Sequence, residues 1–469
     1  MTPSEALPKV LDRIDADLDN SLARLFDFLR LQSISTDPAY ADQCKSAAEF
    51  VAKDIETLGL KAEMRPTSGH PVVIGKSQDK SPEQTNGGPR VLFYGHYDVQ
   101  PVDPLDLWET PPFDPRIEDL GNGRKIIVAR GACDDKGQLM TFLEACRAFK
   151  VVTGKLPLDI TVMIEGEEEC GSKGLFSFVK ENADEFKRDM ALVCDTAMWN
   201  QTTPSVTTSL RGLVYEDVIV TAADRDLHSG LFGGAAANPI RVLAKALAAI
   251  HDDDGRITIP GFYDGVPELP DDIKADLKAL NLTAEEFLGQ IGLSIPSGEK
   301  GRMLIEMIST RPTCDVNGII GGYTGEGAKT VIASQASAKV SFRLVGDQNP
   351  EKVQQAFRAF IRARIPADCK VEFENHGLAP ALQLPFDSPA IVKTRKALQD
   401  EWGHKAVTVG AGGSIPIVGD FKRVLGMDSL MVGFALDDDR VHSPNEKFDL
   451  TSFHKGTRSW ARILAALAS

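Results

Sequence analysis

The N-terminal part of the chain alternates between two patterns of apolar residues. Short apolar runs end at Tyr94, Ile164 and Cys194, and each run predicts a buried strand. Between these runs, apolar residues recur three or four positions apart, as in 22–29 and 136–149, which predicts amphipathic helices. Regular alternation of strands and helices is typical of a layered α/β domain with a central, largely parallel sheet.

A different order of elements begins after residue 212. Strands are expected at 213–220, 336–345 and 370–373, and helices are expected to begin at the Asn-Pro pairs 238–239 and 349–350. The order β-α-β-β-α-β is that of a split βαβ, ferredoxin-like sandwich. We therefore expect an α+β domain here.

The α+β module is itself interrupted and is followed by a return to the first pattern. The acidic stretch 252–296 contains Gly and Pro and predicts an insertion with weak helices near 273–280 and 284–288. An α/β pattern resumes at Leu382, with an apolar strand expected at 430–436. The expected domains are one α/β domain made of 1–212 and 382–469, and an inserted domain, 213–381.

Composition narrows the classes of protein. With 469 residues, 42% apolar residues and a formal net charge of -15, the chain can bury sizeable cores and should repel phosphate backbones, so we expect no nucleic-acid partner. No apolar run of about eighteen residues and no signal peptide occurs, so we expect no membrane partner and a cytoplasmic location. Seven cysteines without a C-x-x-C pair do not indicate a disulfide framework.

Polar side chains that follow the apolar runs supply candidate chemistry. These residues, with one acid that precedes a helix, are His96, Asp134, Glu168, Glu169, Asp195 and His442. Ligands bind at the carboxyl ends of strands in open α/β sheets. The set predicts a two-metal hydrolytic site in which His96, Asp195 and a shared Asp134 hold one ion, His442, Glu169 and Asp134 hold the other, and Glu168 is the base. Mixed imidazole and carboxylate ligands favour zinc, cobalt or manganese.

Each local motif also has a plainer interpretation. His96 and Asp98 lie two positions apart on an extended segment, so the carboxylate could orient the imidazole. Asp134 alone could be a helix N-cap, and the acids at 167–169 could form a solvated turn. The segment 410–414 is not a phosphate loop; its N–H groups and Ser414 could hold a substrate carboxylate, or it could be a simple turn.

Taken together, several motifs carry a resemblance to a known family. They are 95–100 (GHYDVQ), 108–113 (WETPPF), 130–137 (RGACDDKG), 168–172 (EECGS), 226–230 (DLHSG) and 442–446 (HSPNE). This set resembles the co-catalytic metallopeptidase family of carnosinase-type and cytosolic nonspecific dipeptidases, over nearly the whole chain. Succinyl-diaminopimelate desuccinylase, aminoacylase and glutamate carboxypeptidases are more distant relatives.

The resemblance implies a role for each site residue. It implies the same two ligand sets around Asp134, with Asp98 orienting His96 and with Glu168 as general base, because the family pattern places Gly171 two residues after the ligand Glu169. It further implies that 1–212 and 382–469 form the catalytic domain, and that 213–381 is a lid and dimerisation domain. His228 would reach the substrate carbonyl from the other subunit of a homodimer, and Arg343 and Ser414 would meet the substrate carboxylate.

The resemblance thus implies hydrolysis of the peptide bond of dipeptides by water activated by two divalent metal ions, most simply zinc. Two alternatives remain open. An N-acyl-amino-acid deacylase or a carboxypeptidase would use the same chemistry on another substrate. A non-catalytic metal-binding or peptide-binding protein could keep the fold, although Glu168 beside Glu169 speaks against a storage role.

Overall fold

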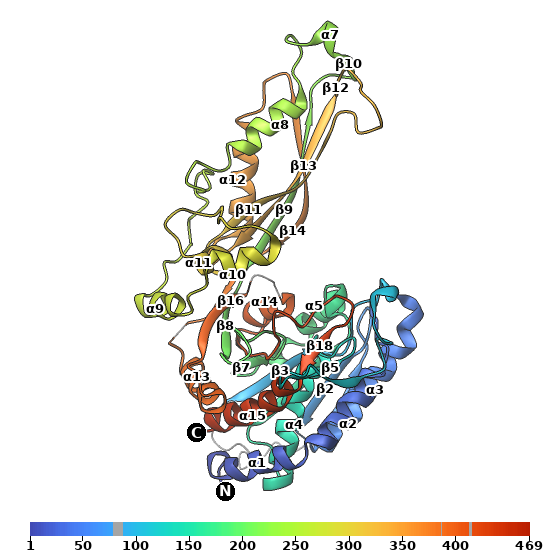
Figure 1. Cartoon of the computed structure of the whole chain (residues 1–469), viewed down its shortest axis with the longest axis vertical. Helices are drawn as coiled ribbons and strands as arrows, with labels where there is room; N and C mark the ends of the chain where they lie inside the picture. The colour runs from blue at the N-terminus through green and yellow to red at the C-terminus, as the bar shows by residue number, and fades with distance from the viewer. Residues whose placement is uncertain (78–87, 386, 412–414) are drawn as a thin grey trace. The chain divides into compact units, whose positions relative to one another are not determined.

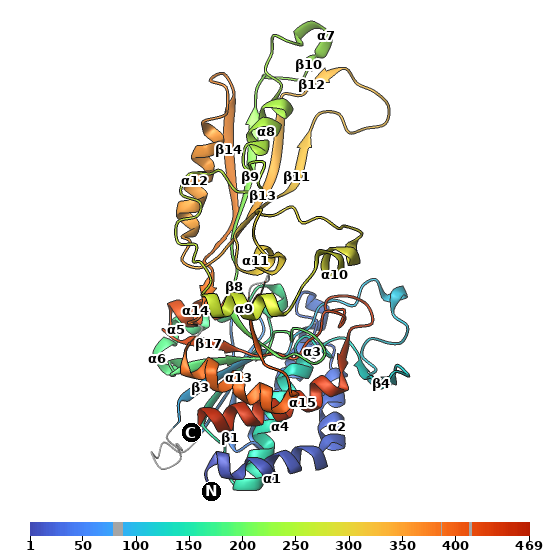
Figure 2. The ribbon, with the colours of Figure 1, turned by 60° about the vertical axis from the view of Figure 1, so that its left-hand side comes forward.

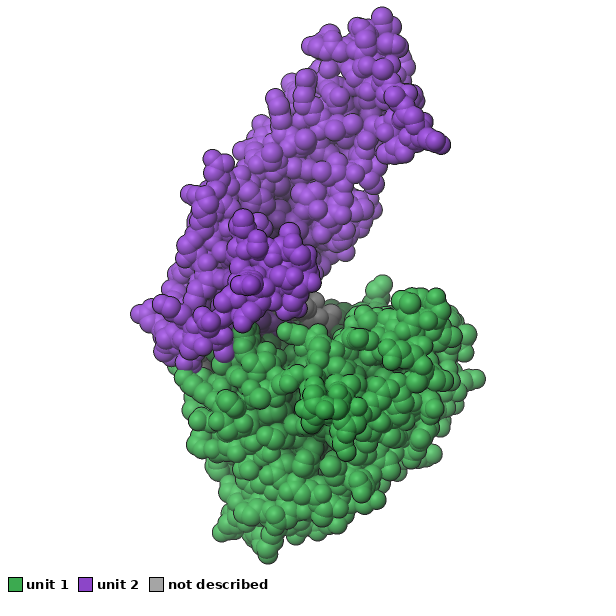
Figure 3. All heavy atoms as spheres, in the orientation of Figure 1, with its two compact units in different colours: residues 1–208, 384–409, 415–469 green, residues 209–383, 410–414 purple. Residues whose placement is uncertain are grey.

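The chain folds into two compact units. A computed structural model describes residues 1–77, 88–385, 387–411 and 415–469. Unit 1 contains residues 1–208, 384–409 and 415–469, and unit 2 contains residues 209–383 and 410–414 (Figure 3). The sequence predicted domain divisions after residues 212 and 381, and the two compact units divide after Thr208 and Gln383.

A nine-stranded sheet forms the centre of the larger fold (Figure 1). Its strands, in spatial order, are β1 (Leu60–Arg65), β2 (Val72–Ser77), β6 (Asp159–Glu165), β3 (Arg90–His96), β7 (Met190–Val193), β17 (Asp428–Met431), β8 (Ser205–Leu210) and β15 (Leu382–Gln383), with β16 (Val407–Ala411) beside β8. The four central strands β6, β3, β7 and β17 pair in parallel. The carboxyl ends of these strands therefore share one edge.

Helices cover both faces of the parallel strands. Phe93 on β3 stacks on Phe142 with a centroid distance of 3.6 Å and meets the edge of Trp460, whereas the next residue, Tyr94, meets Phe421. Successive strand residues face opposite sides, so the helices that carry Phe142 and Trp460 lie on one face and the helix that carries Phe421 lies on the other. This confirms the layered α/β prediction for the larger fold.

The helices of unit 1 are α1 (Pro3–Ala16), α2 (Leu18–Leu29), α3 (Ala41–Thr57), α4 (Lys136–Thr153), α5 (Lys173–Glu181), α6 (Ala183–Phe186), α13 (Pro389–Trp402), α14 (Pro416–Arg423) and α15 (Leu450–Leu467). A small antiparallel sheet of β4 (Arg116–Asp119), β5 (Lys125–Val128) and β18 (Lys447–Asp449) stands beside them. In the described part of the chain, no helix is both long and apolar enough to span a bilayer.

Unit 2 is built on a four-stranded antiparallel sheet (Figure 2). Its order is β11 (Thr313–Gly321), β13 (Gln335–Leu344), β9 (Gly212–Thr221) and β14 (Lys370–Ala379), with every neighbouring pair antiparallel. With α8 (Pro239–Ala248) and α12 (Pro350–Arg362), the chain order is β-α-β-β-α-β, and the split βαβ prediction is confirmed. Asn238 and Asn349 cap the two helices through their side chains, as expected.

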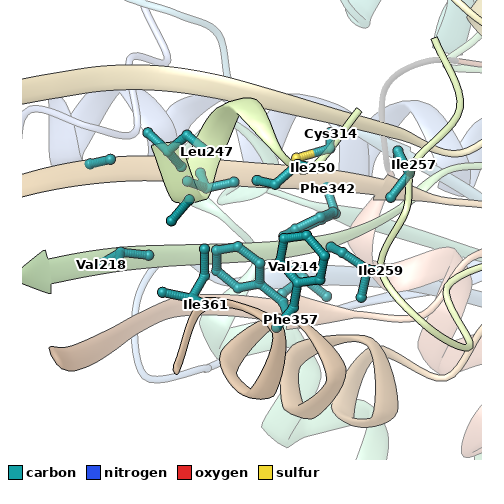
Figure 4. Close-up of a cluster of buried hydrophobic side chains, with 14 of the residues drawn as sticks. Val214, Val218, Leu247, Ile250, Ile257, Ile259, Cys314, Phe342, Phe357 and Ile361 are labelled. Atoms are coloured by element: carbon teal, nitrogen blue, oxygen red, sulfur yellow. The ribbon is translucent and has the colours of Figure 1, made fainter. Parts of the chain in front are cut away.

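The core of unit 2 lies between one face of this sheet and the two helices. Even-numbered residues such as Val214, Val218 and Phe342 are buried, and they pack with Phe357 and Ile361 of α12 (Figure 4). Odd-numbered residues of β9 and β13 are only partly buried. The second face of the sheet is therefore more exposed than the face that packs on the helices.

The remaining elements of unit 2 are short. They are β10 (Leu227–His228), α7 (Ser229–Phe232), α9 (Asp271–Ala279), α10 (Ala284–Leu288), α11 (Leu304–Ser309) and β12 (Val331–Ile332). Helices α9 and α10 fall where the insertion was expected to be helical. One strand prediction was too long: β17 ends at Met431, and the apolar residues that follow continue toward residue 436 without being part of the strand. Burial explains the apolar run, because Val432 and Phe434 are fully buried in irregular backbone.

Candidate metal centre

Three parallel strands deliver candidate ligands to one edge of the large sheet. His96 is the last residue of β3, and its register partner on β6 is Glu165. Glu168 and Glu169 follow β6 in a short 3-10 turn, Glu168–Cys170, and Asp195 follows β7. Because β6, β3 and β7 are neighbours in this order, the side chains after them lie close together.

Asp134 and His442 come from two loops that one buried carboxylate ties together. The carboxylate of Glu446 accepts hydrogen bonds from the backbone N–H groups of Gly131 (3.0 Å), Cys133 (2.9 Å) and Asp134 (3.0 Å). It also pairs with the buried Arg130 at 2.8 Å. Glu446 follows His442 by four residues, so this one side chain fixes the turn that carries Asp134 relative to the loop that carries His442.

The turn at Asp134 leads directly into α4, and its backbone is tightly packed against the start of this helix. A Cβ atom at Gly137 would lie 1.8 Å from the carbonyl oxygen of Ala132, so only glycine fits at this position. The peptide bond between Asp134 and Asp135 is cis. The side chain of Asp135, which is fully buried, accepts a hydrogen bond from the backbone N–H of His96 at 3.2 Å.

Asp134 lies between the two imidazoles. Its Oδ1 is 3.1 Å from Nε2 of His96, and its Oδ2 is 2.9 Å from Nε2 of His442. His442 Nε2 is also 3.2 Å from Oε2 of Glu169. These side chains form two sets of potential ligand atoms, and the atoms within each set lie within 4.8 Å of one another. His96, Asp134 and Asp195 form one set, and Asp134, Glu169 and His442 form the other. The structure thus brings together all five side chains that the sequence marked as ligands.

The acids of this centre lack the cations that neutralise other acidic clusters in the chain. Among the described residues, no lysine or arginine forms an ion pair with Asp134, Glu168, Glu169 or Asp195. By contrast, the cluster of Asp438, Asp439 and Asp449 is neutralised by Lys447 and Arg124. Uncompensated acids at a partly buried site are costly unless they hold protons or bind cations. The donor set therefore fits two divalent metal ions.

The titration of these groups reflects their crowding. Burial, followed by the charge of Asp134, raises the pKa of Asp195 to about 7. Burial, with the charges of Asp195 and Glu169, raises the pKa of Glu168 to about 8. Burial alone would raise the pKa of Asp134, but the contacts with His442 and His96 hold it below its ordinary value. Hydrogen bonds to Asp134 and Glu169 raise the pKa of His442 to about 10.

Asp98 holds two parts of the centre at once. Its Oδ1 is 3.3 Å from Nδ1 of His96, whose other ring nitrogen faces Asp134. The same carboxylate accepts hydrogen bonds from the backbone N–H groups of Glu168 (3.3 Å) and Glu169 (3.1 Å). Asp98 therefore positions both the imidazole of His96 and the turn that carries Glu168.

Two supporting residues escaped the sequence interpretation. Ser35 donates a hydrogen bond from its hydroxyl to Asp98 at 2.6 Å, and Gln100 donates from Nε2 to Oε2 of Glu169 at 2.7 Å. Gln100 could have been found, because positions 96, 98 and 100 share one side of an extended segment. Nothing local identifies Ser35, which reaches the site only because residues 33–35 run beside residues 97–99.

The loop that carries His442 adopts a strained backbone. Arg440, His442 and Asn445 all have positive φ angles, of 54°, 62° and 60°. Asn445 anchors this loop by accepting a hydrogen bond from the backbone N–H of Glu109 (2.8 Å) and donating one to the carbonyl of Leu107 (2.9 Å). Left-handed non-glycine residues persist where the surroundings fix them, and they often mark functional sites.

The other expected site residues belong to unit 2. His228 is exposed at the start of α7, where its Nδ1 accepts a hydrogen bond from the backbone N–H of Gly230 at 3.0 Å. A neutral His228 therefore carries its proton on Nε2, which can donate to a ligand oxygen. Arg343 lies partly buried on β13. Ser414 lies outside the described residues.

Comparison with known proteins gives matches over nearly the full chain. The sequence matches Peptidase family M20/M25/M40 over residues 92–466. The Cys-Gly metallodipeptidase DUG1 of Candida albicans is 31% identical, with 98% of this chain and 97% of the relative aligned. The Beta-Ala-His dipeptidase of Homo sapiens is 28% identical, with 99% and 94% aligned. A solved metallo-carboxypeptidase from Sulfolobus solfataricus, 30% identical, has a TM-score of 0.78 and covers 96% of this chain and 99% of its own.

Replacing Glu446 by glutamine should weaken metal binding while preserving the fold. The glutamine amide cannot accept all the hydrogen bonds that fix the turn at Asp134, so we expect metal affinity to fall about 10- to 100-fold. Competitive zinc titration against a chelator measures the affinity, and circular dichroism checks the fold. Glu109→Gln, at an exposed position nearby, is the matched control and should bind like the original protein. Unchanged affinity in Glu446→Gln would show that this carboxylate does not position the ligands.

Metal removal should make stability depend on pH between about 4 and 10. In the metal-free protein the folded-state pKa values of Asp195, Glu168 and His442 are all raised. The folded state then holds more protons than the unfolded chain, so stability falls as the pH rises through this window. Bound cations replace these protons, and the loaded protein should keep its melting temperature. Thermal unfolding with and without chelator tests this, and equal pH slopes in both states would contradict it.

Proposed function

Because the chain belongs to peptidase family M20/M25/M40, it is a metal-dependent hydrolase, and we propose that it hydrolyses the peptide bond of dipeptides. The observation that carries this proposal is the carboxylate of Asp134 between two imidazoles, with further acids that have no lysine or arginine partner. The named metallodipeptidases at similar length support the choice of substrate.

We assign the ligands as two sets that share one residue. His96, Asp134 and Asp195 would hold one ion, and Asp134, Glu169 and His442 would hold the other. When bound, two such cations lower the pKa of a water molecule and polarise a carbonyl group. Imidazole and carboxylate donors favour zinc, with manganese or cobalt as alternatives.

Glu168 is the proposed general base. Its side chain is partly buried beside the ligands and forms no hydrogen bond to any residue within the described ranges. Asp98 accepts a hydrogen bond from the backbone N–H of Glu168, so the backbone of this residue is fixed while its carboxylate can still bind water. A carboxylate held in this way can take a proton from water and return it to the leaving amine.

We further propose that 213–381 acts as a lid and dimerisation domain for the catalytic domain formed by 1–212 and 382–469. His228 of one subunit would donate its Nε2 proton to the carbonyl oxygen of a peptide held by the other subunit. An exposed edge strand supports a homodimer: β11 has no partner on one side in the described chain, and it exposes Val316, Ile319 and Ile320.

Recognition of the substrate carboxylate would direct cleavage to the peptide bond next to the C-terminal residue. Arg343 and Ser414 are the residues proposed to meet this group. A guanidinium is suited to a carboxylate because it offers parallel N–H donors. We also propose a cytoplasmic location, since all seven cysteines are free thiols, as expected in a reducing compartment.

A carboxypeptidase or an N-acyl-amino-acid deacylase is the second candidate, and the similarity to a metallo-carboxypeptidase favours the former. Rates on an unblocked dipeptide, its N-acetylated form and a longer peptide separate the three activities. A dipeptidase prefers the unblocked dipeptide. Metal-dependent hydrolysis of any of these substrates would exclude the hypothesis that the chain is a non-catalytic binding protein.

Replacing Glu168 by glutamine should abolish most activity and leave the metal content unchanged. Loss of the proton acceptor should lower kcat by about two to four orders of magnitude. The measurements are the steady-state rate on a dipeptide and metal analysis of the purified variant. Glu167→Gln is the matched control, because Glu167 is the adjacent glutamate and its carboxylate instead lies 3.3 Å from the hydroxyl of Thr67. Full loss in Glu167→Gln with activity retained in Glu168→Gln would reverse the assignment.

Mixed dimers should show whether His228 acts across subunits. His228→Ala and Glu168→Gln homodimers should each be nearly inactive, while a mixed dimer combines one intact base with an intact histidine on the opposite chain. We expect mixed dimers to recover up to about half of one original dimer's activity, because they contain one complete site. Co-expressed subunits with different tags, purified in tandem, provide the sample. Absence of recovery would place the histidine in the same chain as the base.

A further inference from the structure

Two arginines of unit 2 lie near each other without bonding partners. Nε and Nη1 of Arg211 are buried and have no hydrogen-bond partner. Neither Arg211 nor Arg343 forms a hydrogen bond or ion pair with any residue in 1–77, 88–385, 387–411 or 415–469. Other arginines of the same unit, such as Arg358 with Glu216, are paired.

The strand register places the two arginines together. Arg343 on β13 is the partner of Leu213 on β9, and Arg211 precedes Leu213 by two residues. On its other side Arg343 pairs with Thr313, two residues from Asp315. Arg343 belongs to the partly exposed face of the sheet, opposite the core covered by α8 and α12. A ligand can therefore approach this face.

The local charge balance is unfavourable without an anion. Burial, and then the charge of Arg343, lowers the pKa of Arg211, and only Asp315 opposes these effects. Asp315 is exposed and forms no ion pair with either arginine within the described residues. Two guanidinium groups that repel each other and lack partners cost stability in the folded protein. A carboxylate bound beside them would relieve this cost, since both groups present donors.

Strand β16 runs beside β8, the strand that leads to Arg211. A Cβ atom at Gly410 would lie 2.5 Å from Oγ of Ser209, so the backbone at Gly410 packs directly against the strand that leads to Arg211.

We propose that Arg211 is a substrate-binding residue that shares the C-terminal carboxylate of the dipeptide with Arg343. This inference rests on the proposed dipeptidase function and adds a specificity residue to it. Two guanidinium groups on one carboxylate would reject peptides whose terminus is amidated, because an amide carries no charge and leaves the arginines unpaired.

The test compares a free dipeptide, L-alanyl-L-alanine, with its C-terminal amide. Arg211→Met keeps the length of the side chain and removes the charge, and Arg211→Lys restores a charge without the planar fork. Arg362→Met is the matched control, because Arg362 is an exposed arginine on α12, over the ring of Phe373. The measurements are kcat/KM for both substrates and the melting temperature of each variant, all with saturating zinc or manganese.

Arg211→Met should lower kcat/KM for the free dipeptide by about 10- to 100-fold, mainly through KM, and leave the rate on the amide nearly unchanged. Arg211→Lys should recover part of the loss, and Arg362→Met should behave like the original protein. The melting temperature of Arg211→Met should stay equal or rise, because an unpaired charge is removed.

Several outcomes would overturn the inference. An equal loss on both substrates, or a melting temperature well below that of Arg362→Met, would show a structural role. If the unmodified protein with metal fails to cleave any dipeptide, the proposed function fails. An active enzyme whose preference for the free carboxylate survives Arg211→Met refutes only the role of Arg211.

Discussion

The repulsion among buried carboxylates at the edge of the large sheet is the constraint on which the other features of this site depend. Asp134, Asp195, Glu168 and Glu169 converge where no lysine or arginine of the described chain pairs with them. Bound cations would let all four of these carboxylates stay charged at neutral pH. The two imidazoles on opposite oxygens of Asp134 define where two cations would lie, and the remaining unbonded carboxylate, Glu168, is then available to carry a proton.

The fold holds this cluster by hydrogen bonds to the backbone rather than by side-chain contacts alone. Parallel strands place His96, the Glu168–Cys170 turn and Asp195 side by side, while Glu446 fixes the Asp134 turn and Asp98 fixes the turn after β6. Backbone donors cannot rotate away, so they determine ligand positions before metal arrives. In unit 2, two nitrogen atoms of the Arg211 guanidinium are buried without a hydrogen-bond partner, and a bound anion would relieve the cost of burying them.

Hydrophobic periodicity predicted most of the fold, because buried parallel strands and amphipathic helices have distinct patterns. The order of layers and the split βαβ module followed from it, and only local boundaries failed, as at β17, where a buried irregular segment has the composition of a strand. The five candidate ligands could be chosen because metal chemistry restricts residue types. The residues that hold these ligands in place were harder to find. Glu446 accepts hydrogen bonds from backbone N–H groups that lie more than 300 positions earlier in the sequence. Ser35 reaches Asp98 only because two distant segments run side by side, and no sequence motif links these segments. His228 and Arg343 lie in another compact unit, and no local signal connects them to the ligands.

The most direct test of the central claim is an anomalous-scattering map from crystals of the zinc-loaded protein. Two strong peaks are expected about 3.5 to 4 Å apart, as in other two-metal hydrolytic sites, each within bonding distance of a different oxygen of Asp134. His96 and Asp195 should complete the surroundings of one peak, and Glu169 and His442 should complete those of the other. A single peak, or two peaks that Asp134 does not bridge, would contradict the account.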